Sequence, residues 1–282
     1  MTEMKFARTP EDVAIAARNI NFDVEEALAT DWHGGDPFRT AFYNALSIMF
    51  PLGEQHFIDS VKYYRSRITD PVLAEQVRGF TAQESVHRRE HQKYNEVLCA
   101  ARGYSLDELE RPLRRRIALV QKHMPHIVHL AATVAYEHWT AILADAVLRR
   151  PETFEGATPE MTRLWRWHAI EESEHKAVAF DVYRTVGGSE FLRRRLMLVI
   201  TVHFFLDALR HMRLMLRNHE GSRLRLWIDG FKFLCGEQSP LHGLWRPWRA
   251  YFRRGFHPWE QDNRAIVATA LQSLDLVVKT GT

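Results

Sequence analysis

Two Glu-x-x-His pairs are the residues of this chain best suited to carry chemistry. Glu84 and His87 lie in "QESVHRREH", and Glu172 and His175 lie in "HAIEESEH". A helix brings side chains three and four positions apart onto one face, so each pair presents a carboxylate beside an imidazole. His168, four residues before Glu172, shares that face. Such ligands without thiolates suit iron, manganese or zinc, and the recurrence of the pair favours a metal site over chance.

Two more glutamates complete the pattern. Glu54 in "FPLGEQHF" and Glu137 in "ATVAYEHWT" both lie in apolar or aromatic stretches. The order Glu, Glu-x-x-His, Glu, Glu-x-x-His is typical of di-metal sites inside four-helix bundles. Four carboxylates in a core are very costly without cations, and two divalent ions would balance their charge. We therefore predict two metal ions, iron first with manganese or zinc as alternatives, held by Glu54, Glu84, His87, Glu137, Glu172 and His175.

Neighbouring polar residues have less certain roles. His168 fits a ligand and a hydrogen-bonding support for a ligand equally well. His91, one turn beyond the first pair, fits a supporting or substrate-pocket role better than direct ligation. Glu171 and Glu174 point away from the shared face, which predicts either solvent exposure or a supporting role. If the site hydrolyses its substrate, Glu171 and His91 are the nearest candidates for a catalytic base.

Helical periodicity dominates the chain, and alternation of apolar and polar residues is nearly absent, which predicts an all-α fold. Asp70 and Thr158 fit helix N-caps, and Gly103 and Gly187 fit helix ends. The long helices that should position the site are expected at about 37–68 with an interruption at Pro51, 70–103, 113–149 with a kink at Pro125, 158–187 and 189–219, followed by shorter helices.

The domain organisation follows from the same pattern. No linker divides the chain, so we predict one all-helical domain over residues 1–282. Its expected parts are an irregular N-terminal region at about 1–36, a metal-binding four-helix bundle at about 37–187, and a C-terminal helical extension at about 188–282.

Composition narrows the class of protein. The net charge of +3 calls for no nucleic-acid partner, and two cysteines, Cys99 and Cys235, are too few for a disulfide scaffold. The first twenty residues carry acids and no apolar core, so we expect no secretory signal. The stretch "LMLVITVHFFLDALRHM" is broken by His203 and Asp207 and is too short to span a bilayer. We interpret it as a buried helix in a cytoplasmic protein, with contact at the inner membrane surface as an alternative.

Five blocks of the sequence resemble a known family. "FPLGEQHF", "GFTAQESVHRREHQKYN", "AYEHWTA", "HAIEESEHKAVAFDVY" and "YFRRGFHPW" are similar, in this order, to the ferritin-like family labelled "predicted metal-dependent hydrolase". The resemblance spans residues 15–265 and implies a ferritin-like four-helix bundle with additional C-terminal helices. We have no chemical role for "GFHPW"; we expect it to brace the bundle, although His257 could instead reach the pocket entrance.

A second resemblance concerns spacing alone. His168-x-x-x-Glu172-x-x-His175 is similar to the p-aminobenzoate N-oxygenase type of di-iron enzyme, which carries one histidine more than the usual six-ligand set. This resemblance implies His168 as a seventh ligand beside Glu54, Glu84, His87, Glu137, Glu172 and His175.

Three functions fit these residues. We expect first a di-iron oxidoreductase that activates O₂ to oxidise a small apolar or aromatic substrate, with an unidentified electron donor. The alternative is a metal-dependent hydrolase that uses a metal-activated water, which seven protein ligands would leave little room for. The second alternative is a metal-storage or structural bundle. The sequence is also compatible with a homodimer.

Overall fold

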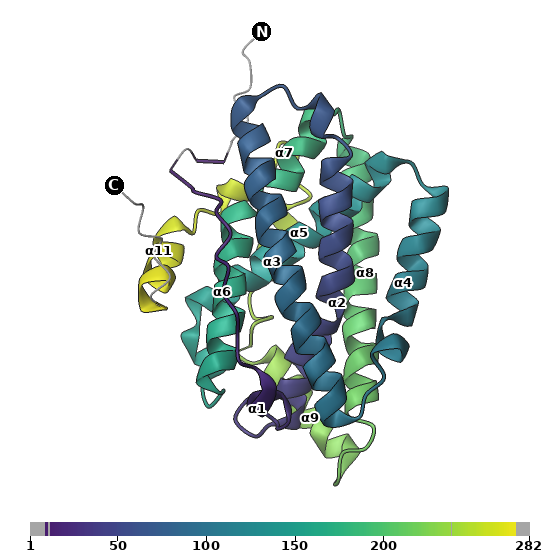
Figure 1. Ribbon diagram of the computed structural model, residues 1–282, viewed down its shortest axis with the longest axis vertical. Coiled ribbons are helices and arrows are strands. Elements are labelled where there is room, and N and C mark those ends of the chain that lie inside the picture. The colour runs from purple at the N-terminus through teal and green to yellow at the C-terminus, as the bar shows by residue number, and fades with distance from the viewer. Residues whose placement is uncertain (1–8, 11, 238, 275–282) are drawn as a thin grey trace.

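The structure, a computed structural model, describes residues 9–10, 12–237 and 239–274. The described residues form helices and no β-strand, apart from one isolated antiparallel bridge between His33 and Ala157. The all-α prediction is therefore confirmed (Figure 1). The helices are α1 Glu25–Leu28, α2 Pro37–Lys62, α3 Pro71–Arg102, α4 Leu106–His123, α5 His126–Arg149, α6 Pro159–His175, α7 Val178–Thr185, α8 Glu190–Met215, α9 Arg223–Cys235, α10 Trp245–Ala250 and α11 Arg264–Ser273, with short 3₁₀ turns at Arg65–Arg67, Pro151–Phe154 and Pro258–Glu260.

Four helices carry the predicted metal ligands and pack around a common interior. α2 packs along α3, and α5 packs along α6, with α3 also contacting α6 and α7. α8 covers α2 and α5 from the side, and α4 packs on α2, α3 and α5 (Figure 1). The likeness of this helical bundle to the ferritin type stays a prediction.

Local sequence signals set most helix ends. Asp36 and Asp70 accept backbone hydrogen bonds from the first turns of α2 and α3, and a proline follows each at the first helical position. Gly103 ends α3 with φ of 67°, a left-handed conformation that glycine adopts without strain. Asp70 and Gly103 thus lie where they were predicted. Thr158 occupies the N-cap position of α6, but its hydroxyl makes no capping bond; its N–H instead donates to the Trp32 carbonyl.

Three helix predictions are corrected at their boundaries. α2 runs unbroken through Pro51 and ends at Lys62, because one proline removes a single backbone donor and the surrounding turns persist. The expected helix over 113–149 is two helices, since the residue before Pro125 is extended and ends α4. The expected helix over 158–187 breaks after His175 into α6 and α7.

The apolar helix α8 is buried on one face only. Met197 and Phe204 face the core, whereas Leu198, Val202 and Leu206 are 52%, 57% and 56% exposed. The interpretation as a buried helix is therefore wrong for its outer face, because no described element packs over it. In the part of the chain that is described, no helix has the length and apolar character needed to cross a membrane.

Candidate metal centre

The structure brings all seven predicted ligands together. α2 contributes one, α3 two, α5 one and α6 three, and each side chain points to the space between these helices. None is more than 5% exposed: Glu54, Glu84, His87, Glu137, His168, Glu172 and His175.

The donor atoms form two overlapping groups that share Glu84. In one group Glu84 lies with Glu54 and His87, and in the other with Glu137 and His175; within each group the donor atoms are no more than 4.8 Å apart. His175 Nε2 lies 3.1 Å from Glu84 Oε1 and 3.5 Å from Glu137 Oε2. A carboxylate common to both groups is the arrangement expected of a bridging ligand.

Glu172 approaches both groups from α6. Its Oε1 lies 3.4 Å from His87 Nδ1 and 3.5 Å from His175 Nε2. Distance alone also groups His87 with His168 and Glu172, and Glu54 with His91 and His168. The α6 residues therefore join the donors supplied by α2, α3 and α5.

Unpaired buried atoms show that these residues fit metal ions. Both carboxylate oxygens of Glu54, Glu84 and Glu137 are buried without a hydrogen-bond partner. The same holds for one atom each of three more residues, His87 Nδ1, Glu172 Oε2 and His175 Nε2. Orphaned buried polar atoms are rare because each costs free energy, and here they gather in one place. Cations between them would satisfy all of these atoms at once.

The electrostatics of the cluster also indicate that these residues fit metal ions. Burial raises the pKa of the Glu54, Glu84 and Glu137 carboxyls above the ordinary value, because no water stabilises the ionised form. Repulsion among the neighbouring carboxylates adds to this effect. Bound cations would reverse it and keep the carboxylates ionised.

Glu171 orients His87 from outside the ring of donors. His87 Nε2 lies 2.9 Å from Glu171 Oε2, which leaves Nδ1 directed at the cluster. Trp167 Nε1 and the backbone and guanidinium of Arg18 donate to the other oxygen, Oε1. Burial disfavours a charged His87, yet the neighbouring carboxylates of Glu171 and Glu172 raise its pKa to about 10. Such carboxylate–histidine pairs fix the ring and raise its basicity toward a metal.

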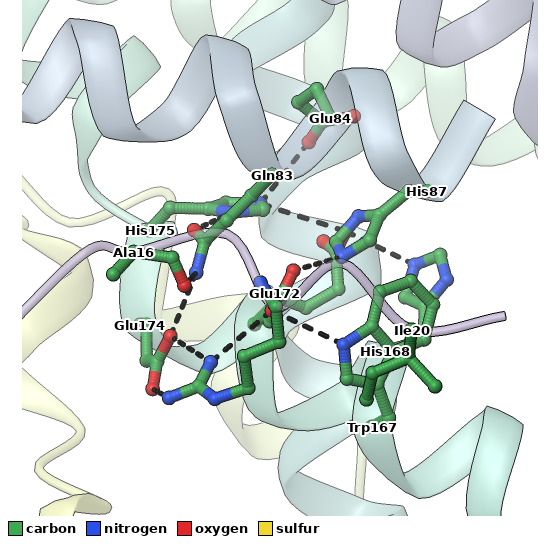
Figure 2. Close-up of polar contacts among 12 residues, drawn as sticks. Ala16, Ile20, Gln83, Glu84, His87, Trp167, His168, Glu172, Glu174 and His175 are labelled. Carbon is green, nitrogen blue, oxygen red and sulfur yellow. Dashed lines mark hydrogen bonds and ion pairs between the residues drawn. The ribbon is translucent and has the colours of Figure 1, made fainter. Parts of the chain in front are cut away.

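Gln83 orients His175 in the same manner (Figure 2). Gln83 Oε1 lies 2.9 Å from His175 Nδ1, and its Nε2 donates to Glu174 Oε2 at 2.7 Å. Arg18 binds Glu174 through both terminal nitrogens, at 2.9 and 2.6 Å. Both ligand-orienting carboxylates, Glu171 and Glu174, thus meet one arginine. Neither carboxylate is solvent-facing, and the supporting role is the one that the geometry favours.

A hydrogen-bonded chain reaches the cluster from α2 and α3. Asn95 Nδ2 donates to the Ser47 carbonyl, and the single Ser47 hydroxyl proton goes to Asn95 Oδ1 at 2.8 Å. His91 Nδ1 lies 2.8 Å from that hydroxyl, and His91 Nε2 lies 2.7 Å from His168 Nδ1. His168 Nε2 lies within hydrogen-bond distance of Glu172 Oε1, at 3.1 Å. Burial lowers the pKa of His168 to about 4, so its ring is neutral near pH 7.

Sequence reasoning missed Arg18, Gln83 and Asn95. Arg18 lies in the segment expected to be irregular, where no periodicity relates it to a helix face. Gln83 directly precedes Glu84, which by helical spacing points it away from the metal-facing stripe. Asn95 follows His91 by four residues, and this spacing was the one available signal for it.

The "GFHPW" block lies away from the donors and braces α7. His257 Nε2 lies 3.0 Å from Asp181 Oδ1, and its Nδ1 accepts from the Trp259 backbone. Together with Glu260 it forms a capping box at a 3₁₀ turn. His257 is 3% exposed, and both of its ring nitrogens take part in these bonds. It therefore acts as a brace and does not lie at a pocket entrance.

Comparison with known proteins finds one family. A family model described as "Predicted metal-dependent hydrolase" matches residues 16–262. The chain matches no curated protein and no solved structure in these comparisons.

This match overturns the first functional expectation. An oxygen-activating di-iron oxidoreductase is the wrong prediction, and metal-dependent hydrolysis, its stated alternative, is the activity named by the family. The physical reason is that carboxylate and imidazole ligands hold redox-active and purely Lewis-acidic cations alike. Ligand types and spacing therefore predict metal binding without deciding the reaction.

Proposed function

We propose that this chain, which belongs to the family of predicted metal-dependent hydrolases, binds two divalent cations between α2, α3, α5 and α6 and hydrolyses a small molecule there. The observation that carries the proposal is the gathering of unpaired buried donor atoms into two groups that share Glu84. Six residues would hold the cations, which we expect to be iron, manganese or zinc: Glu54, Glu84, His87, Glu137, Glu172 and His175.

Bound cations would polarise the bond to be cleaved and lower the pKa of a water molecule. The chain's own residues have the remaining tasks. Glu171 and Gln83 hold His87 and His175 in position, so that the donor set need not reorganise when it binds. The helices around the cluster exclude bulk water, which strengthens every electrostatic interaction inside.

The proton of the attacking water needs an acceptor. Neither predicted base suits this task, because both Glu171 oxygens and both His91 nitrogens are engaged in hydrogen bonds. We assign the role to His168, whose ring is kept neutral near pH 7 because burial lowers its pKa to about 4. Glu172 Oε1, 3.1 Å away, would stabilise the charged imidazole and share the proton.

Two variants of α6 test the division of roles. Glu172→Ala is expected to lose most bound metal, measured by elemental analysis of purified protein. His168→Gln is expected to keep the metal and to lose about 10²-fold or more in turnover of p-nitrophenyl acetate. Full metal retention in Glu172→Ala would refute the ligand set. Loss of one metal in His168→Gln would make His168 the seventh ligand and refute its role as base.

A further inference from the structure

Next to the cluster lies an apolar cavity of about 220 Å³, enclosed by α2, α4, α5 and α8. Its walls are almost wholly apolar and include Phe57, Ile117, Val128 and Ile200. The volume is below the roughly 300 Å³ at which pockets begin to hold drug-sized ligands. It therefore suits one extended chain or a single ring.

This cavity adjoins the predicted reaction centre. A second space of about 50 Å³ is lined by His168 and Glu172, and Phe50 and Thr140 line both spaces. The Phe50 ring lies 4.9 Å from that of His168, centroid to centroid. The two spaces thus adjoin at Phe50 and Thr140, and a ligand in the larger cavity would lie across these two residues from His168.

The polar groups in these walls argue against a charged ligand. The described lining of the smaller space contains no lysine or arginine, so a phosphate or carboxylate there would have no cationic partner from the protein. In the larger cavity, Arg116 is already paired with Asp207 of α8. Both features favour an uncharged reacting group on an uncharged chain.

The cavity also has an apolar approach. Val199 lines it and is 42% exposed, so the cavity reaches the surface at α8. The neighbouring Leu198 and Val202, on the outer face of the same helix, are more than half exposed. A hydrophobic molecule would meet an apolar surface before it entered.

From these contacts we propose that the substrate is a carboxylic ester with an unbranched apolar chain, and that the cavity behind Phe50 and Thr140 holds this chain. The proposal rests on the proposed hydrolase function. Water adds to the ester carbonyl carbon, the bond from that carbon to the alkoxy oxygen breaks, and an acid and an alcohol form. One proton of the water ends on the departing oxygen, so no other reactant is needed.

The proposal is tested by varying the length of the substrate's acyl chain and the size of one side chain in the cavity wall. The metal-containing protein should hydrolyse p-nitrophenyl octanoate with a kcat/KM at least about tenfold above that for the acetate, because the longer chain fills the cavity. Val128→Phe, at a half-buried wall position, should remove this preference. Val72→Phe, the same exchange at a 58% exposed position of α3, should behave as wild type.

Calorimetric titration with octan-1-ol, with and without a chelator, separates binding from turnover. Saturable binding of octan-1-ol to wild type, weakened at least about tenfold by Val128→Phe, supports the chain pocket. If such binding is found and no ester is cleaved, only the hydrolase function is refuted. Ester turnover without chain-length preference, unaffected by Val128→Phe, overturns the chain pocket and leaves the hydrolase function standing. Should Val128→Phe fail to fold, Ala132→Leu on the same wall replaces it, with the same outcomes.

Discussion

Arg18 and Glu174 form an ion pair across 156 positions of sequence, with Arg18 Nη2 2.6 Å from Glu174 Oε1. The same guanidinium lies 3.2 Å from Glu171, and the three side chains are at most 10% exposed. The irregular N-terminal segment is thereby tied to the two carboxylates that support the metal-facing histidines. Its role is to complete the site, although none of its described residues bonds to the donors.

Arg18→Met should therefore destabilise the protein and weaken its metal binding. Removing one partner of a buried ion pair leaves an uncompensated charge, and we expect a loss of about 3 kcal/mol in the free energy of unfolding. Urea unfolding and elemental analysis measure the two effects. Arg149→Met, which breaks a half-exposed pair with Asp145, is the control and should leave the metal content unchanged. Equal metal content in both variants would contradict the supporting role of Arg18.

Gln83→Leu should lower metal affinity without removing a donor. His175 Nδ1 would lose its acceptor, so the ring would no longer be held with Nε2 toward Glu84. Losses of about 10- to 100-fold are typical when such a supporting partner is removed. Competition with a chelator of known affinity measures the change. Gln92→Leu removes an exposed amide of the same helix and should have no effect; equal affinities in the two variants would rule out the orienting role.

Asn95→Leu tests the hydrogen-bonded chain. Without Asn95 Oδ1, the Ser47 hydroxyl donates to His91 Nδ1, and the proton of neutral His168 is then held on Nε2, facing Glu172. We expect turnover of p-nitrophenyl acetate to fall by about 10²-fold while the metal content stays as in wild type. Nitrogen-15 NMR of the histidine rings reports the tautomers directly. An unchanged His168 tautomer in this variant would disprove the chain of donors.

Removal of metal should lower thermal stability. A ligand present at about 100 times its Kd stabilises the folded state by about 2.7 kcal/mol, and here it would also relieve mutual repulsion among buried carboxylates. For a chain of this size we expect Tm to fall by about 5–10 °C on chelation. Differential scanning calorimetry before and after chelation, with metal added back as the control, measures the shift. A Tm that does not respond to either treatment would argue against cations at the cluster.

The site was predictable where one helix brought its residues together. Glu172 and His175 share a face through backbone geometry alone, and Glu84 and His87 repeat the relation on α3. Glu54 and Glu137 were found through their apolar surroundings, which mark a buried charge that needs a partner. Arg18 has no such signal, because its contact with Glu174 joins an irregular segment to a distant helix.

The helical class, most caps and the residues able to bind metal were determined by the sequence itself, because they depend on local spacing and on the chemistry of single side chains. The tertiary structure decided which atoms of those residues are left unpaired, which tautomer His168 adopts, and that an apolar cavity adjoins it. These properties depend on contacts between helices far apart in the chain. Only packing in three dimensions sets such contacts, so no local pattern records them.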